Sequence, residues 1–172
     1  MSDFAAGPQH DLAGMRLHYD AGRLLEGDLA PTPGEQFARW LADAVAAEVV
    51  EPNAMVLSTS DADGVPSGRT VLLKAADARG FVFYSNHQSR KGRALATNPR
   101  ASLVFPWYSL TRQVVVVGEV EAGGYVVRPV SFEFWQGRPS RLHDRLRYVR
   151  LDESAPCALD DPTAWRTERL SP

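Results

Sequence analysis

The chain has 172 residues, of which 44% are hydrophobic and 23% charged, so it is predicted to fold as one domain rather than to stay disordered. Its formal net charge of -2 argues against a protein that wraps nucleic acid. The single Cys157 cannot form an intrachain disulfide, and the four histidines lack the spacing of a metal site. No apolar run reaches the roughly 18 residues that span a bilayer, and no signal peptide is recognisable. These features predict a cytoplasmic protein without a metal or a membrane anchor.

The N-terminal half begins without periodicity and then becomes helical. Residues 1–14 mix Gly, Pro, Ser and Asp and are predicted to form a flexible lead, whereas residues 15–172 are predicted to form the single domain. In residues 35–48, Phe37, Leu41 and Val45 recur at the spacing of one helical face, which predicts an amphipathic helix.

From Ala54 onward the pattern is that of short strands. Turn sequences DADG and DARG separate the runs 54–60, 69–75 and 81–85, which predicts an antiparallel meander. Ser89 can cap a short helix that stops at Asn98-Pro99. Further strands are predicted at 101–107, 112–121, 125–135 and 164–170. Strands outnumber helices and no βαβ rhythm is present, so we expect a mainly β protein (α+β), a closed or nearly closed barrel with flanking helices.

Cationic residues at two places indicate an anion site. Arg69 and Lys74 bracket an apolar strand centre on opposite faces, although each can also be a charge at a strand end. Arg90 and Lys91 follow Ser89 at a predicted helix start, where free N–H groups and the helix dipole favour a phosphate. A solvated basic first turn explains these two residues equally well.

Gln113 and the segment 132–148 provide further polar candidates. Gln113 precedes four valines and offers a donor and an acceptor to a ring edge. The segment contains two Phe, a Trp, four Arg and a His. Taken singly, His143 fits a structural histidine and the arginines fit ion pairs with Asp144 and Glu133. Taken together, they favour a functional cluster.

Six short sequence motifs occur in this order between about Met15 and Pro172: RTVLLK, SRKGR, FPW, RQV, FWQGR and RLHDR. In these motifs the chain closely resembles the pyridoxine (pyridoxamine) 5′-phosphate oxidase family. The resemblance implies an FMN-binding split β-barrel with Greek-key-like antiparallel strands. It also implies a homodimer that holds FMN at the subunit interface, where the valine run and Trp107 are expected. The implied reaction oxidises pyridoxamine and pyridoxine 5′-phosphates to pyridoxal 5′-phosphate with oxygen, in vitamin B6 coenzyme synthesis.

The resemblance also assigns roles to particular residues. It implies that the FMN-binding residues are Arg69, Thr70, Val71, Leu72, Leu73, Lys74, Tyr84, Ser85, Arg90, Lys91, Gln113, Trp135 and Arg145. It implies that the substrate-binding residues are Lys74, Arg141, Leu142, His143, Arg16 and Tyr19, with Arg141 and His143 catalytic and Arg16 and Tyr19 on a lid-like segment.

One departure from the family follows Glu121. Relatives carry a helical segment there with further substrate and flavin contacts, whereas here Glu121 and Ala122 lead directly into Gly123. Either the protein has lost this segment, or the sequence joins the two sides of a longer region. The persistence of Arg141 and His143 favours the second explanation.

Three other functions remain as alternatives. They are a flavin- or pyridoxal-phosphate-binding module without turnover, a split-barrel flavin oxidoreductase with another substrate, and a nucleic-acid-binding barrel. Dispersed basic residues and the negative net charge disfavour the last.

Overall fold

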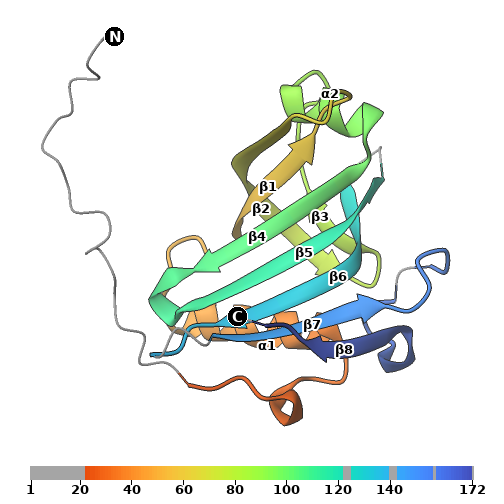
Figure 1. The fold of residues 1–172 in the computed structure, drawn as a ribbon. Coiled ribbons are helices and arrows are strands. Elements are labelled where there is room, and N and C mark those ends of the chain that lie inside the picture. The colour runs from red at the N-terminus through yellow and green to blue at the C-terminus, as the bar shows by residue number, and fades with distance from the viewer. Residues whose placement is uncertain (1–21, 122–124, 140–142, 157, 172) are drawn as a thin grey trace, which may run out of the picture.

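The computed structural model describes residues 22–121, 125–139, 143–156 and 158–171. The N-terminal lead, Arg16, Tyr19, Arg141, Leu142 and Cys157 lie outside these ranges. The described chain forms one antiparallel sheet with two α-helices, as Figure 1 shows. Its strands are β1 (Ala54–Ser60), β2 (Pro66–Asp77), β3 (Gly80–Phe83), β4 (Arg100–Trp107), β5 (Arg112–Glu121), β6 (Val126–Gln136), β7 (Asp144–Arg150) and β8 (Trp165–Arg169).

The sheet closes into a barrel. Strand order is β3-β2-β1-β4-β5-β6-β7-β8, and β3 also pairs with β6, so six strands form a ring and β7 and β8 extend beyond it. Strand β4 returns beside β1 after the β1–β2–β3 meander, which is a Greek-key arrangement. The predicted mainly β split barrel with flanking helices is therefore confirmed.

Helix α1 (Pro33–Ala46) closes one end of the barrel. The Thr32 side chain caps it by accepting a hydrogen bond from the Glu35 N–H at 3.2 Å. Phe37 packs edge-on against Phe81 and Phe105, with ring centroids 4.8 and 4.9 Å away. The buried stripe continues through Trp40 and Ala44. Val45, which was predicted to lie on this face, is instead 59% exposed because the stripe follows i, i+3 and i+7.

Helix α2 (Arg90–Thr97) lies at the opposite end, in the connection from β3 to β4 (Figure 1). Ser89 caps it as predicted, since its hydroxyl oxygen accepts a hydrogen bond from the Gly92 N–H at 3.2 Å. The ranges that the structure describes also contain three short 3-10 helices, at Glu26–Asp28, Tyr108–Leu110 and Pro162–Ala164. Within the described residues no helix is long and apolar enough to cross a membrane.

Strand β7 was not predicted. Its residues alternate buried and half-buried, as a strand with one interior face requires. Two of the buried positions are Asp144 and Arg150, so the run appears charged rather than amphipathic in the sequence. Trp107 also differs from expectation: it is 2% exposed within the monomer, where its indole N–H donates to the Pro52 carbonyl at 2.9 Å, so it is not an interface residue.

The connection from β5 to β6 is short. Glu121 and Val126 are register partners, and so are Val120 and Val127, so the two strands pair up to the connection itself. Arg128 forms an ion pair with Glu121 at 2.5 Å. Strands β5 and β6 are thus antiparallel neighbours as far as Glu121 and Val126, the described residues nearest to the departure noted in the sequence.

Candidate functional site

Arg69 extends toward the interior at the end of the barrel that α2 covers. It pairs with Leu57 across the β1–β2 hairpin, and Leu57 is fully buried. Its guanidinium donates to the Leu57 carbonyl at 3.1 Å and to the Thr59 and Ser67 hydroxyls at 2.9 and 2.5 Å. These three acceptors, bound through the in-plane N–H groups, hold the guanidinium at a fixed position. Thr59 and Ser67 were missed in the sequence, although their parity places them on the same face of the hairpin as Arg69.

Arg90 lies close enough to Arg69 to affect its ionisation. Burial, and then repulsion from Arg90, lowers the pKa of Arg69 below its usual value. In the described part of the chain, neither arginine forms an ion pair with a carboxylate. Two neighbouring cations beside a helix N-terminus form a site that an anion would stabilise. The geometry thus favours the anion site over a solvated basic turn.

Tyr84, Ser85 and Lys91 lie around this anion site. Tyr84 is 72% exposed, and the Ser85 hydroxyl lies 3.4 Å from that of Ser89, the α2 cap. Lys91 is half-buried in the first turn of α2. Five of the predicted FMN-binding residues therefore gather at one end of the barrel.

The strand from Thr70 to Lys74 presents alternate side chains to opposite surfaces. Val71 and Leu73 share the inward side with Arg69, whereas Thr70, Leu72 and Lys74 point outward. Arg69 and Lys74 therefore lie on opposite faces, as their spacing predicted.

Gln113, Trp135 and Arg145 form a second group on the outer surface. They are direct cross-strand neighbours on β5, β6 and β7. The Arg145 guanidinium binds Glu133 at 2.8 and 3.2 Å and donates to the Ser171 carbonyl at 2.8 Å. The Glu133 hydrogen bonds raise the pKa of Arg145. The structural ion pair considered for Arg145 is thus formed.

The two groups face different sides of the barrel wall. Arg69 extends inward from β2, whereas Gln113, Trp135 and Arg145 lie on the outer surface. By the shorter way around the ring, through β3, two strand spacings of about 4.8 Å each separate β2 from β6. A ligand that contacts both groups must therefore reach both sides of the barrel wall.

His143 adjoins the second group at the end of the β6–β7 connection. Its ring centroid lies 4.7 Å from that of Trp135. Its Nδ1 accepts a hydrogen bond from the Arg138 backbone N–H at 3.1 Å, which fixes the ring orientation. His143 is half-buried beside a predicted flavin-binding residue.

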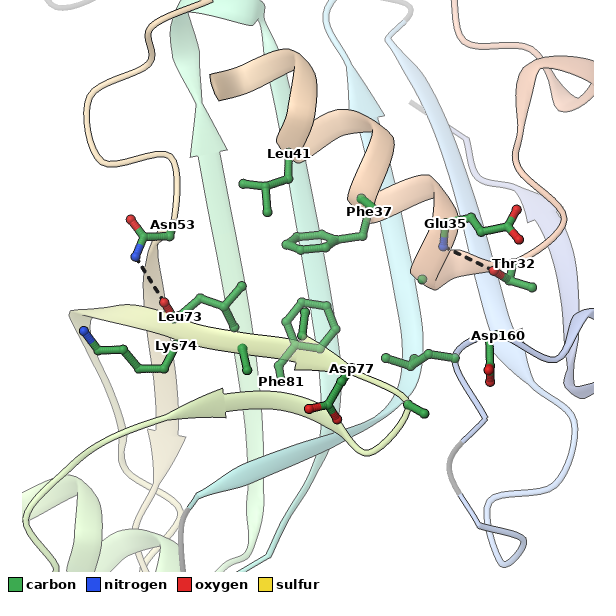
Figure 2. A pocket seen from close by; sticks show the side chains of 16 residues that line it. Thr32, Glu35, Phe37, Leu41, Asn53, Leu73, Lys74, Asp77, Phe81 and Asp160 are labelled. Atoms are coloured by element: carbon green, nitrogen blue, oxygen red, sulfur yellow. Dashed lines mark hydrogen bonds between the residues drawn. The ribbon is translucent and has the colours of Figure 1, made fainter. Parts of the chain in front are cut away.

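A separate cavity of about 530 Å³ lies between α1 and the β2–β3 hairpin (Figure 2). Its walls are largely apolar and include Phe37, Leu41, Leu73 and Phe81. Lys74 lies at its edge, and the Asn53 amide donates to the Leu73 carbonyl beside it at 3.1 Å. Among the predicted site residues only Leu73 and Lys74 line it, so it is distinct from the anion site.

Asp144, which was considered only as an ion-pair partner, organises the chain beside His143. This carboxylate is 3% exposed and accepts hydrogen bonds from the Leu24 N–H at 3.1 Å, Arg169 at 3.1 Å and Arg138 at 3.4 Å. Burial opposes its ionisation, but the Leu24 hydrogen bond and the two cations together lower its pKa. Asp144 therefore ties an N-terminal segment, the β6–β7 connection and the last strand together.

Replacing Asp144 with Asn should destabilise the fold by about 2 kcal/mol at neutral pH, because two arginines lose their buried anion. Since its pKa is lowered in the folded state, Asp144 stabilises the protein above the unfolded pKa of about 3.9, and this stability is lost as the pH falls through the folded value. Urea unfolding at neutral and acidic pH measures both effects. Asp63→Asn, at an exposed turn, should change neither. Equal acid sensitivity of wild type and Asp144→Asn would contradict the assignment.

Comparison with known proteins bears on both groups of residues. The family model described as pyridoxamine 5′-phosphate oxidase matches residues 41–133. A second, described as the pyridoxine 5′-phosphate oxidase C-terminal dimerisation region, matches residues 123–172.

Curated relatives match over almost their whole length. The pyridoxine/pyridoxamine 5′-phosphate oxidase of Kineococcus radiotolerans is 43% identical, with 94% of this chain and 99% of the relative covered. That of Streptomyces avermitilis is 41% identical, with 96% and 98% covered. The first alignment extends over 224 residues, more than this chain contains, so the relative has internal residues without a counterpart here.

Solved structures share the fold. PhzG from Burkholderia lata, solved in complex with tetrahydrophenazine-1-carboxylic acid, superposes with a TM-score of 0.75 at 26% identity, covering 88% of this chain and 99% of PhzG. An FMN-binding protein from Nostoc punctiforme, related to pyridoxamine 5′-phosphate oxidase, has a TM-score of 0.65 at 15% identity, covers 84% and 99% of the two chains, and supports the fold alone. The matches to the two family models and to the curated relatives show that this chain belongs to the pyridoxamine 5′-phosphate oxidase family.

Proposed function

We propose that the protein binds FMN and oxidises pyridoxamine and pyridoxine 5′-phosphates to pyridoxal 5′-phosphate, with oxygen as the electron acceptor. The observation that carries the proposal is the proximity of Arg69, on β2, to Arg90 at the start of α2, in a chain of this family. The two guanidiniums, with Lys91 and the α2 N–H groups, suit the FMN phosphate.

The remaining residues fit the parts of a flavin that carry no charge. Thr70 and Leu72 lie on the outer surface of β2, next to the anion site in sequence. Gln113 and Trp135 offer an amide and an aromatic face. When bound, FMN supplies the redox chemistry by taking a hydride from the substrate and passing two electrons to oxygen, which leaves as hydrogen peroxide.

The chain's own residues position the substrate in this proposal. Lys74 and Arg141 supply cations for the substrate phosphate and for the region of the reacting carbon. His143, held by the Arg138 N–H and packed against Trp135, brings an imidazole to the same surface.

A homodimer completes the proposed site. On the outer surface, Val56, Val104 and Val115 form a continuous row across β1, β4 and β5. Figure 1 shows β4, β5 and β6 with no helix in front of them. Packing this surface against a second copy would cover the valine row and bring the anion site of one chain toward Trp135 of the other. The match to a family dimerisation region supports the same assembly.

PhzG indicates a second candidate, a flavin oxidase for a carboxylated polycyclic substrate. The structure of that protein contains tetrahydrophenazine-1-carboxylic acid, and its fold matches this chain closely. Oxygen consumption with the two vitamin B6 phosphates and with this compound separates the candidates. If only tetrahydrophenazine-1-carboxylic acid were turned over, the proposed vitamin B6 phosphates would not be the substrates.

The FMN phosphate is expected to provide much of the binding energy, so the protein should bind FMN more tightly than riboflavin. Arg90→Ala should weaken FMN binding about tenfold or more, since a hydrogen bond to a charged group contributes roughly 1.5–3 kcal/mol. Riboflavin affinity and the melting temperature should stay near wild type because Arg90 is exposed. Arg100→Ala, at another exposed arginine, is the control. Equal affinity of the wild type for FMN and riboflavin would contradict the proposed binding site for the FMN phosphate.

A further inference from the structure

Tyr125 connects the barrel to the loop that leads into α2. Its side chain is 3% exposed, and its hydroxyl lies 2.9 Å from Nδ1 of His87, with which it forms a hydrogen bond. The two ring centroids are 5.0 Å apart. On its other side the Tyr125 ring stacks on Phe83, with centroids 5.2 Å apart and an interplanar angle of 15°. The phenol is therefore fixed by packing as well as by the hydrogen bond.

The barrel fixes the Tyr125 backbone. Its carbonyl accepts a hydrogen bond from the Phe83 N–H at 3.1 Å, next to the β3–β6 pairing that closes the ring. Its φ angle of 44° is left-handed, a conformation that a bulky residue adopts only where its surroundings impose it. Tyr125 thus provides a rigid attachment point directly after the β5–β6 connection.

The loop that contains His87 packs directly against the first turn of α2. The His87 carbonyl packs on Gly92 in the first turn of α2, where a Cβ atom would come within 2.3 Å of its oxygen. The Ser89 N–H, at the helix cap, donates to the Asn86 carbonyl at 3.1 Å. With so little space between loop and helix, a shift of His87 moves the start of α2 and with it Arg90.

The pair itself is not a ligand site. The space beneath it, bounded by His87, Gly92 and Tyr125 among others, is about 40 Å³, which is too small for a flavin or its phosphate group. The Tyr125–His87 pair can therefore act only by positioning the residues around it.

We propose that Tyr125 and His87 are positioning residues for the FMN phosphate. Their hydrogen bond holds the loop 84–89 against the closing strands, so that the α2 N–H groups and Arg90 converge on the same point as Arg69. This inference rests on the proposed function, because it assigns the anion site to a flavin phosphate.

Tyr125→Phe tests the inference, since it removes the hydroxyl and keeps the stacked ring. It should raise the Kd for FMN about fivefold, the worth of one hydrogen bond, and change the Kd for riboflavin less than about twofold. Tyr148→Phe is the matched control: it removes a buried hydroxyl that donates to the Ala30 carbonyl at 2.5 Å, far from α2. This control should lower the melting temperature without changing the ratio of the two affinities.

Hydrogen exchange of residues 84–92 in flavin-free protein gives a readout that is independent of flavin binding. These amides should exchange faster in Tyr125→Phe than in Tyr148→Phe, and adding His87→Ala to Tyr125→Phe should have little further effect. If the wild type prefers FMN but Tyr125→Phe leaves both the preference and the exchange unchanged, the positioning role is wrong and the proposed function stands. If the wild type shows no preference for FMN, the proposed function fails, and the positioning role fails with it.

Discussion

Replacing Val104 with Asp should convert the protein to a monomer that no longer retains FMN. Val104 lies at the centre of the outer valine row, with Val56 and Val115 as its direct cross-strand neighbours. In a symmetric dimer the carboxylate would enter the interface twice, and burying an unpaired charge costs several kcal/mol. Because the proposed flavin site lies between two copies of the chain, loss of the partner copy should also remove the cofactor.

Light scattering and the flavin absorbance of the purified protein measure the two effects together. Val50→Asp is the control, because it makes the same chemical change at a valine that is 87% exposed and away from the strands. Far-ultraviolet circular dichroism shows whether the Val104→Asp monomer keeps its strands. A Val104→Asp protein that stays dimeric and yellow would place the interface elsewhere. A wild-type monomer that binds FMN would refute the shared site.

Strands rich in apolar and β-branched residues could be predicted from the sequence, whereas a strand with buried charges could not. Strands β1 and β5 were predicted with the bounds that the structure shows, because their runs AMVL and VVVV favour a strand. Strand β7 was missed because Asp144 and Arg150 occupy interior positions. Their partners come from distant segments, such as Leu24 and Arg169 for Asp144, and no local pattern reports such contacts.

The candidate site likewise has features that could be predicted from the sequence and features that could not. The Ser89 cap of α2, which precedes Arg90 of the candidate anion site, was predictable because a helix cap is a local signal. The relative placement of Arg69 and Trp135 was not predictable without the strand order, which pairs β1 with β4 and closes the ring through β3 and β6. The contact between His87 and Tyr125 joins residues 38 positions apart and depends on that closure.

Replacing Arg141 with Ala should reduce turnover about 100-fold or more while leaving flavin content and melting temperature near wild type. His143, two residues along the chain, packs against Trp135 on the outer surface, next to the predicted flavin position. Residues two apart in an extended segment project to the same side, so Arg141 is expected to reach the same ligand as His143. A guanidinium that positions the substrate and stabilises charge as the hydride leaves contributes through alignment, and small misplacements of a substrate cost about this much.

Oxygen consumption with pyridoxine 5′-phosphate, at matched flavin occupancy, tests this expectation. Arg141→Lys should recover only part of the rate, because an ammonium lacks the planar fork that binds a phosphate or carboxylate through two hydrogen bonds. Arg79→Ala is the control, since Arg79 is an exposed arginine paired with Asp77 at 2.7 Å, and such surface pairs contribute little to stability. If Arg141 only formed a surface ion pair, its alanine variant would behave like this control. Equal rates for wild type and Arg141→Ala would therefore exclude Arg141 from the active site.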